Sequence, residues 1–104
     1  MDGPYRAWSE AAQAALARFR PHNTEDTPEG DVMIDVEVVV GKPKKTVKVR
    51  PSGDVDNYAK GVYDAITSTG GFWKDDDQIV KEVVMKRWAE PDETPGYHIR
   101  ITYL

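Results

Sequence analysis

The chain has 104 residues, of which 39% are hydrophobic and 31% are charged, and its formal net charge at pH 7 is −4. A chain of this length predicts a single domain, residues 1–104, near the lower size limit of a self-sufficient hydrophobic core. The absence of cysteine excludes disulfides, zinc–thiolate sites and thiol nucleophiles, and the net acidity argues against a protein that simply coats nucleic acid.

Apolar residues at helical spacing predict a first helix that begins at Pro4 and ends near Phe19 or Arg20, before Pro21. A polar loop leads to "VMIDVEVVV", residues 32–40, where apolar and acidic residues alternate as in a half-exposed strand. The sequence "GKPK" predicts a turn, and the alternation in "KTVKVR" predicts a return strand over residues 45–50.

The second half of the chain predicts one helix and two strands. The helix covers residues 56–68 and ends at Gly70 and Gly71. The segments "QIVKEVVMKRW" and "YHIRITY" are rich in β-branched residues and predict two strands joined by the loop "AEPDETPG". The predicted order is α-β-β-α-β-β, a two-layer α+β domain with a mixed sheet and two helices on one face.

No segment predicts targeting or a membrane span, because apolar runs such as residues 38–40 are far too short. We therefore expect a soluble intracellular protein that does not contact a membrane.

Basic residues are concentrated in "KPKKTVKVR", residues 42–50, which contains five cations and no acid. The five are Lys42, Lys44, Lys45, Lys48 and Arg50. One interpretation is a solvated hairpin, and the other is a ribbon that faces the phosphates of a nucleic acid.

Acidic residues gather in "GDVDN" and in "KDDD", residues 74–77. Just before a helix the backbone is extended, so Asp54 and Asp56 point to the same side. Lys60 follows Asp56 by one helical turn. Each feature has an ordinary alternative: Asp54 or Asp56 as a helix N-cap, residues 75–77 as a solvated turn, and Lys60 as a surface ion-pair partner worth about 0.3–0.5 kcal/mol.

A divalent cation would remove the repulsion between clustered carboxylates, and hard oxygen ligands suit Mg²⁺ or Mn²⁺. A metal held by acids beside a lysine fits phosphodiester hydrolysis. The ion polarises the phosphoryl oxygen and lowers the pKa of the attacking water, while the lysine neutralises growing negative charge.

Four segments, "DVDNYAKGVYDAI", "GFWKDDDQIV", "VVMKRW" and "PGYHIRI", resemble RusA-type Holliday-junction resolvases, in the same order. The resemblance covers residues 51–102, and "YRAWSEAAQAAL" is similar to the first helix of that family. It implies a Mg²⁺- or Mn²⁺-dependent endonuclease, without an organic cofactor, that resolves four-way DNA junctions by paired symmetric nicks.

The resemblance also implies residue roles. Asp54, Asp56 and Asp76 correspond to the metal-binding, catalytic carboxylates of the family, and Lys60 corresponds to its catalytic lysine. Asp75 is a further candidate ligand.

The implied partner is branched DNA, bound by a homodimer whose two-fold axis matches the symmetry of a four-way junction. We expect the five cations of residues 42–50, together with Lys74, to grip the junction arms. The expected location is the cytoplasm of a bacterial cell, and the family is common in prophages.

The sequence departs from the family at its start, where a strand rich in Pro, Asn and Arg usually precedes the first helix. Here Met1, Asp2 and Gly3 lead almost directly into that helix, so we expect the sheet to lack that strand. One alternative function is therefore a junction-binding module with weak or no catalysis, and another is a nuclease that acts on flaps or forks.

Overall fold

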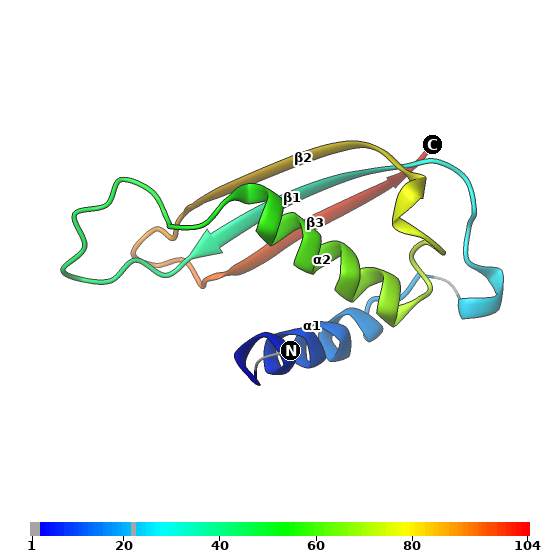
Figure 1. The fold of residues 1–104 in the computed structure, drawn as a ribbon, viewed down its shortest axis with the longest axis horizontal. Coiled ribbons are helices and arrows are strands. Elements are labelled where there is room, and N and C mark those ends of the chain that lie inside the picture. The colour runs from blue at the N-terminus through cyan, green and yellow to red at the C-terminus, as the bar shows by residue number, and fades with distance from the viewer. Residues whose placement is uncertain (1–2, 22) are drawn as a thin grey trace.

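The computed structural model describes residues 3–21 and 23–104 of the chain (Figure 1). Within them, the secondary-structure elements in chain order are α1 (Gly3–Ala17), η1 (Thr24–Asp26), β1 (Val32–Val40), α2 (Val55–Thr69), η2 (Asp76–Gln78), β2 (Ile79–Trp88) and β3 (Gly96–Tyr103), where η is a 3₁₀ helix.

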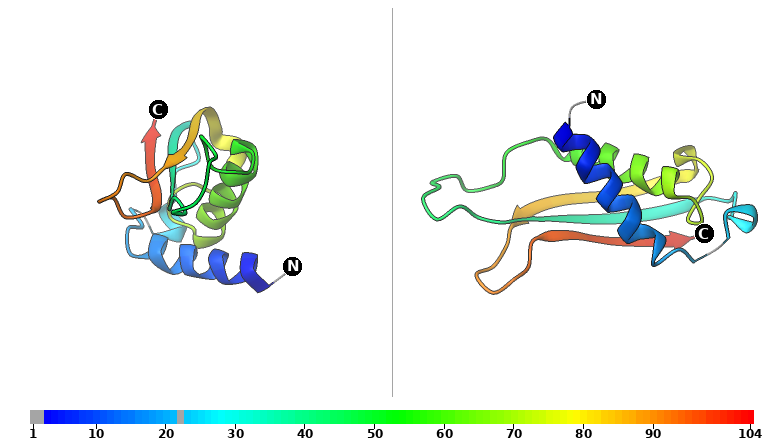
Figure 2. Two further views of the ribbon diagram at one scale, coloured as in Figure 1. Left: turned by 90° about the vertical axis from the view of Figure 1, so that its left-hand side faces the viewer. Right: turned by 90° about the horizontal axis from the view of Figure 1, so that it is seen from below.

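The sheet has the strand order β2-β1-β3, with β1 parallel to β2 and antiparallel to β3. Because parallel neighbours need a crossover connection, α2 lies between β1 and β2 in the chain and packs on the sheet. Both α-helices of the described chain lie on one side of the sheet (Figure 2). The α+β class, the mixed sheet and the placement of the helices confirm the prediction.

The core forms where β1 meets α2. Val32, Ile34, Val36 and Val38 alternate along β1 and are at most 3% exposed. They face a cluster that includes Val62, Ile66, Phe72 and Trp73. The intervening residues of β1 lie on the open side of the sheet and are mostly half-buried, as the alternating sequence predicted.

The predicted strand over residues 45–50 is wrong, because these residues belong to an irregular loop in the structure. Val47 and Val49, which the predicted strand would place on one face, are 96% and 83% exposed. The physical reason is that β2 and β3 occupy both edges of β1, so a return strand has no free edge of β1 to pair with.

The first helix ends at Ala17, slightly before the predicted end. Beyond it, the Arg20 guanidinium donates hydrogen bonds to the carbonyls of Thr69 (2.7 Å) and Gly70 (3.0 Å). These contacts satisfy carbonyls at the end of α2, where Gly70 has a φ of 77°. Arg20 thus fixes the end of α1 against the end of α2.

The α1 helix packs mainly on α2, and residues of α1, α2 and β3 line an apolar groove of about 670 Å³. The sequence-based expectation that no strand precedes α1 involves Met1 and Asp2, which lie outside the described residues. Neither α-helix in the described ranges is long and apolar enough to cross a membrane.

One ion-pair network holds the loop between β2 and β3. Arg87 donates to both carboxylate oxygens of Glu93, each at 2.6 Å, and to Glu37 on β1 at 3.2 Å. The backbone N–H of Glu90 also donates to Glu93. The hydrogen bonds from Arg87, followed by the one from Glu90, lower the pKa of Glu93 to about 2.

We predict that Glu93→Gln reduces the acid sensitivity of the fold. Because the pKa of Glu93 is depressed from 4.5 to about 2, its stabilising effect is complete above pH 4.5 and disappears as the pH falls toward 2. Thermal unfolding between pH 6 and 2 should show a steeper loss of stability for the wild type than for the variant. Equal slopes would contradict the role of this pair, and Glu90→Gln, which keeps the backbone donor, is the control.

Candidate metal and nucleic-acid site

Asp54 and Asp56 lie exposed at the start of α2. Asp54 occupies the N-cap position, but its side chain makes no capping hydrogen bond. Its backbone carbonyl instead accepts from the N–H groups of Asn57 (3.1 Å) and Tyr58 (3.4 Å). The Asp54 carboxylate is therefore not used as a cap, and the positive end of the helix dipole partly offsets the repulsion between the two acids.

The two residues before Asp54 are held by both α2 and β2. The Tyr58 hydroxyl donates to the Ser52 carbonyl at 2.8 Å, and Lys86 on β2 donates to the Gly53 carbonyl. Gly53 has a φ of 95°, and a Cβ there would lie 3.3 Å from the Tyr58 ring. This segment requires glycine, and its double attachment fixes where the Asp54 side chain begins.

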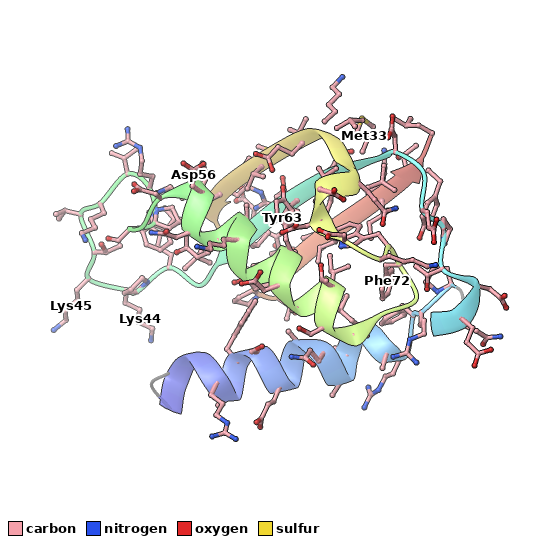
Figure 3. All side chains as sticks on the ribbon, turned by 45° about the vertical axis from the view of Figure 1, so that its right-hand side comes forward. Met33, Lys44, Lys45, Asp56, Tyr63 and Phe72 are labelled. Carbon is pink, nitrogen blue, oxygen red and sulfur yellow. The ribbon has the colours of Figure 1, made fainter. Side chains whose placement is uncertain are left out.

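The cations of residues 42–50, here called the cationic loop, lie beside this end of α2. Trp88 donates to the Lys48 carbonyl at 3.0 Å, and the Lys48 ammonium donates to Ser52 at 2.6 Å. Figure 3 shows Lys44 and Lys45 pointing outward from the loop, beyond the end of α2 that carries Asp56. All five cations of the loop are exposed, and none forms an ion pair with a described residue; Lys48 alone is held, by its hydrogen bond to Ser52.

Lys60 is exposed on α2, one turn after Asp56. No ion pair joins Lys60 to Asp56, to Asp64 or to another acid of the described chain. The surface ion pair, which was the ordinary alternative for this lysine, is thus not formed, and its ammonium group is available to a ligand.

The second acidic group is part of η2, a turn built around the buried amide of Gln78. The Gln78 Oε1 accepts from the backbone N–H groups of Lys74 (2.7 Å) and Asp75 (3.0 Å). Its Nε2 donates to the carbonyls of Pro28 (2.9 Å) and Gly30 (2.8 Å). All the hydrogen-bonding capacity of this amide is used, so the turn is firmly placed.

Within this turn the acids differ in role. The Asp75 carboxylate accepts from the Asp77 N–H at 3.1 Å and completes a capping box with Gln78. Asp76 makes no such contact with the backbone. Partial desolvation of its carboxylate raises the pKa of Asp76, and a side-chain hydrogen bond with Asp75 and the charges of Asp75, Asp64 and Asp77 raise it further. Asp75 therefore stabilises the turn, whereas the ionised form of Asp76 is disfavoured by desolvation and by the neighbouring acids.

The structure does not bring all three predicted carboxylates together. Asp76 interacts with Asp64, which lies about 12 Å further along the α2 axis than Asp56, given a rise of 1.5 Å per residue. No group of three or more acids and histidines in the described ranges could hold a metal ion. Asp54 and Asp56 form one half of the predicted site, and Asp76 lies toward the opposite end of α2 (the yellow turn in Figure 1).

Lys74, the sixth predicted DNA-binding residue, is also separated from the cationic loop. It precedes η2 and forms an ion pair with Glu29, which lowers the pKa of that carboxyl. Its contact with DNA stays a prediction, and such a contact would require Lys74 to exchange Glu29 for a phosphate.

The sequence reasoning missed three residues that position the site, namely Tyr58, Lys86 and Trp88. Lys86 was detectable in principle, because strand alternation places it on the helix-facing side of the sheet with Val84 and Trp88. A charged residue on an inward face requires a partner, and the Gly53 carbonyl supplies it.

The chain matches a known protein family. The model of the family described as endodeoxyribonuclease RusA matches residues 1–102, a range that includes every candidate residue named above. No match to a curated protein or to a solved structure was found.

We predict that Asp76→Asn stabilises the metal-free protein. Because the pKa of Asp76 is raised from 3.8, its ionised form is disfavoured in the folded state, and this cost is present at neutral pH and absent below pH 3.8. Thermal unfolding at pH 7 in a chelator should show a higher melting temperature for the variant, and the gain should vanish in acid. Asp92→Asn, in the exposed loop between β2 and β3, is the matched control. An unchanged or lower melting temperature at pH 7 would contradict the repulsion.

Proposed function

The chain belongs to the RusA endodeoxyribonuclease family, and from this premise we propose that it resolves four-way DNA junctions by metal-dependent nicking. The observation that supports this most directly is the uncapped Asp54 carboxylate. An aspartate at an N-cap normally accepts a backbone hydrogen bond. Here it lies free beside Asp56 and the cationic loop, at a place suited to a phosphate.

Asp54 and Asp56 fit the coordination chemistry of Mg²⁺ or Mn²⁺, which are commonly bound by one or two carboxylates while waters and substrate phosphate oxygens complete the shell. Such an ion, when bound, polarises the phosphoryl oxygen and lowers the pKa of a water molecule. The two aspartates would hold the ion at the N-terminal end of α2. Asp75 is less suited as a ligand, because its carboxylate already caps η2.

Lys60 supplies the positive charge that the reaction requires from the protein. Its ammonium group has no acidic partner in the described chain, and it lies one turn from Asp56. In this position it can neutralise the charge that grows on the phosphate oxygens or on the leaving oxygen.

The cationic loop provides the grip on the DNA arms. Lys44 and Lys45 extend away from Asp56 into solvent (Figure 3), so a duplex arm can contact them while its scissile phosphate approaches Asp54 and Asp56. Binding of this kind releases counterions from DNA, and its strength falls steeply as salt increases.

A homodimer would supply both the second nick and the missing third carboxylate. A two-fold dimer places two equivalent sites in the relation that a junction requires. Since Asp76 lies far from Asp54 and Asp56 within one chain, we propose that each site combines these two aspartates with Asp76 of the partner subunit.

We predict that Asp56→Asn abolishes nicking of a synthetic four-way junction in Mg²⁺ or Mn²⁺ while leaving junction binding unchanged or tighter. The carboxylate is needed to hold the ion, and its removal also lessens repulsion of the DNA phosphates. Product formation on a denaturing gel and a mobility shift in chelator measure the two effects. Asp92→Asn serves as the control.

Nicking by Asp56→Asn at the wild-type rate would contradict the assignment. If the wild type binds junctions but never nicks them, the chain is a junction-binding module. Equal cutting of flaps, forks and four-way junctions would identify a more general structure-selective nuclease.

Mixing two inactive variants tests the shared site. In a mixed dimer of Asp56→Asn and Asp76→Asn subunits, one shared site keeps all three acids, whereas a site built within one chain is always broken. We expect nicking to reappear when the two variants are refolded together. Because only one site is intact, the product should be a singly nicked junction. Persistent inactivity of mixed dimers, verified by differently tagged subunits, would contradict the shared site.

A further inference from the structure

A small pocket of about 260 Å³ lies on the side of α2 that faces α1 and β3. Its lining consists of Trp8, Gly53, Asn57, Tyr58, Gly61 and Tyr97. Three of these six residues are aromatic, and they come from three different elements of the fold. Two others are glycines, which leave space between the rings.

The aromatic walls of the pocket are held in place. Trp8 and Tyr97 contact each other with ring centroids 5.6 Å apart and planes inclined by 56°. Tyr58 is fixed by the hydrogen bond from its hydroxyl to the Ser52 carbonyl. Rigid, partly exposed aromatic faces are the surfaces on which unpaired bases stack.

The pocket adjoins the candidate metal site through the chain itself. Gly53 directly precedes Asp54, and Asn57 directly follows Asp56. With 3.6 residues per turn, Asn57 lies about 100° around the helix axis from Asp56. A ligand in the pocket and a phosphate at the two aspartates would therefore occupy neighbouring faces of the same helical turn.

We propose that this pocket binds one unpaired nucleobase of the strand that is cut, beside the phosphate held at Asp54 and Asp56. The inference rests on the proposed function. The cationic loop next to the pocket selects a polyanion, the aromatic rings select a flat base, and the Asn57 amide offers a donor and an acceptor to the base edge. Asn57 is accordingly the residue that we expect to influence which base is preferred beside the nick.

The test combines changes in the protein with changes in the DNA. Trp8→Leu and Tyr97→Leu are made separately in the full-length Asp56→Asn protein, and binding is measured in chelator so that the DNA stays intact. The probes are four-way junctions with an abasic site at each nucleotide near the branch point in turn, and single-stranded oligonucleotides scanned in the same way. Phe19→Leu, which removes an exposed aromatic ring outside this pocket, is the matched control.

We expect one abasic position to weaken binding of the parent and of Phe19→Leu about 5-fold to 150-fold, the range for loss of one base stacked on an aromatic side chain. The same abasic site should weaken binding of Trp8→Leu and Tyr97→Leu much less, because their pocket no longer holds the base. A folding defect alone would weaken binding to all probes equally, and the relative effect of the abasic site would then be as large as in the parent.

Equal losses for the parent and both pocket variants at every position would overturn the proposal. A change in oligomeric state in either variant, with no abasic-site dependence, would instead identify the pocket as a subunit contact and would also overturn it. An abasic-site effect that the pocket variants lack, seen with single-stranded probes in a protein that does not prefer junctions, would support the base-binding pocket. The same result would contradict the proposed junction substrate.

Discussion

The pairing of β1 on both edges is the constraint from which the rest of the structure follows. With β2 parallel on one side and β3 antiparallel on the other, β1 has no edge left for the residues that come directly after it. The chain must leave the sheet, cross over through α2 and return as β2. The cationic loop is a consequence of this crossover, since it connects the end of β1 to the start of α2. The cationic loop and the acids at the start of α2 therefore lie beyond the carboxyl ends of the parallel strands β1 and β2. Ligands of α/β sheets commonly bind at that end of the strands.

Two different sets of hydrogen bonds position the two groups of acids. At the start of α2, Tyr58 and Lys86 donate hydrogen bonds to the backbone before Asp54. The carboxylates of Asp54 and Asp56 are therefore not needed to hold this segment in place. At η2, the buried Gln78 amide and the Asp75 cap build the turn, and Asp76 is the acid left without a structural contact to the backbone. In each group a structural residue leaves a neighbouring carboxylate available. The separation of the two groups within one chain is the reason for proposing a site shared between two subunits.

Much of this arrangement could be predicted from the sequence. The alternation of apolar residues in β1 and their helical spacing in α2 predicted both elements correctly. One face of each element is buried, and that face is apolar in the sequence. The same reasoning failed at Val47 and Val49, since alternation in a short segment cannot reveal that the neighbouring strand has no free edge. Nor could it reveal the separation of Asp76 from Asp56, which depends on how η2 packs against the 28–30 segment through Gln78. Local periodicity predicts elements, whereas long-range hydrogen bonds decide which side chains meet.

Tyr58 links two properties that could otherwise evolve independently. Its hydroxyl supports the backbone that leads into Asp54, and its ring forms a wall of the aromatic pocket. If the pocket holds a base, any substitution of Tyr58 that alters base preference also moves the first carboxylate of the metal site. Base preference can then change more easily through substitutions of Asn57, Trp8 or Tyr97, because these residues do not hydrogen-bond to the Ser52 carbonyl. Related chains with altered preference should accordingly vary at those three positions while Tyr58 and Gly53 stay the same.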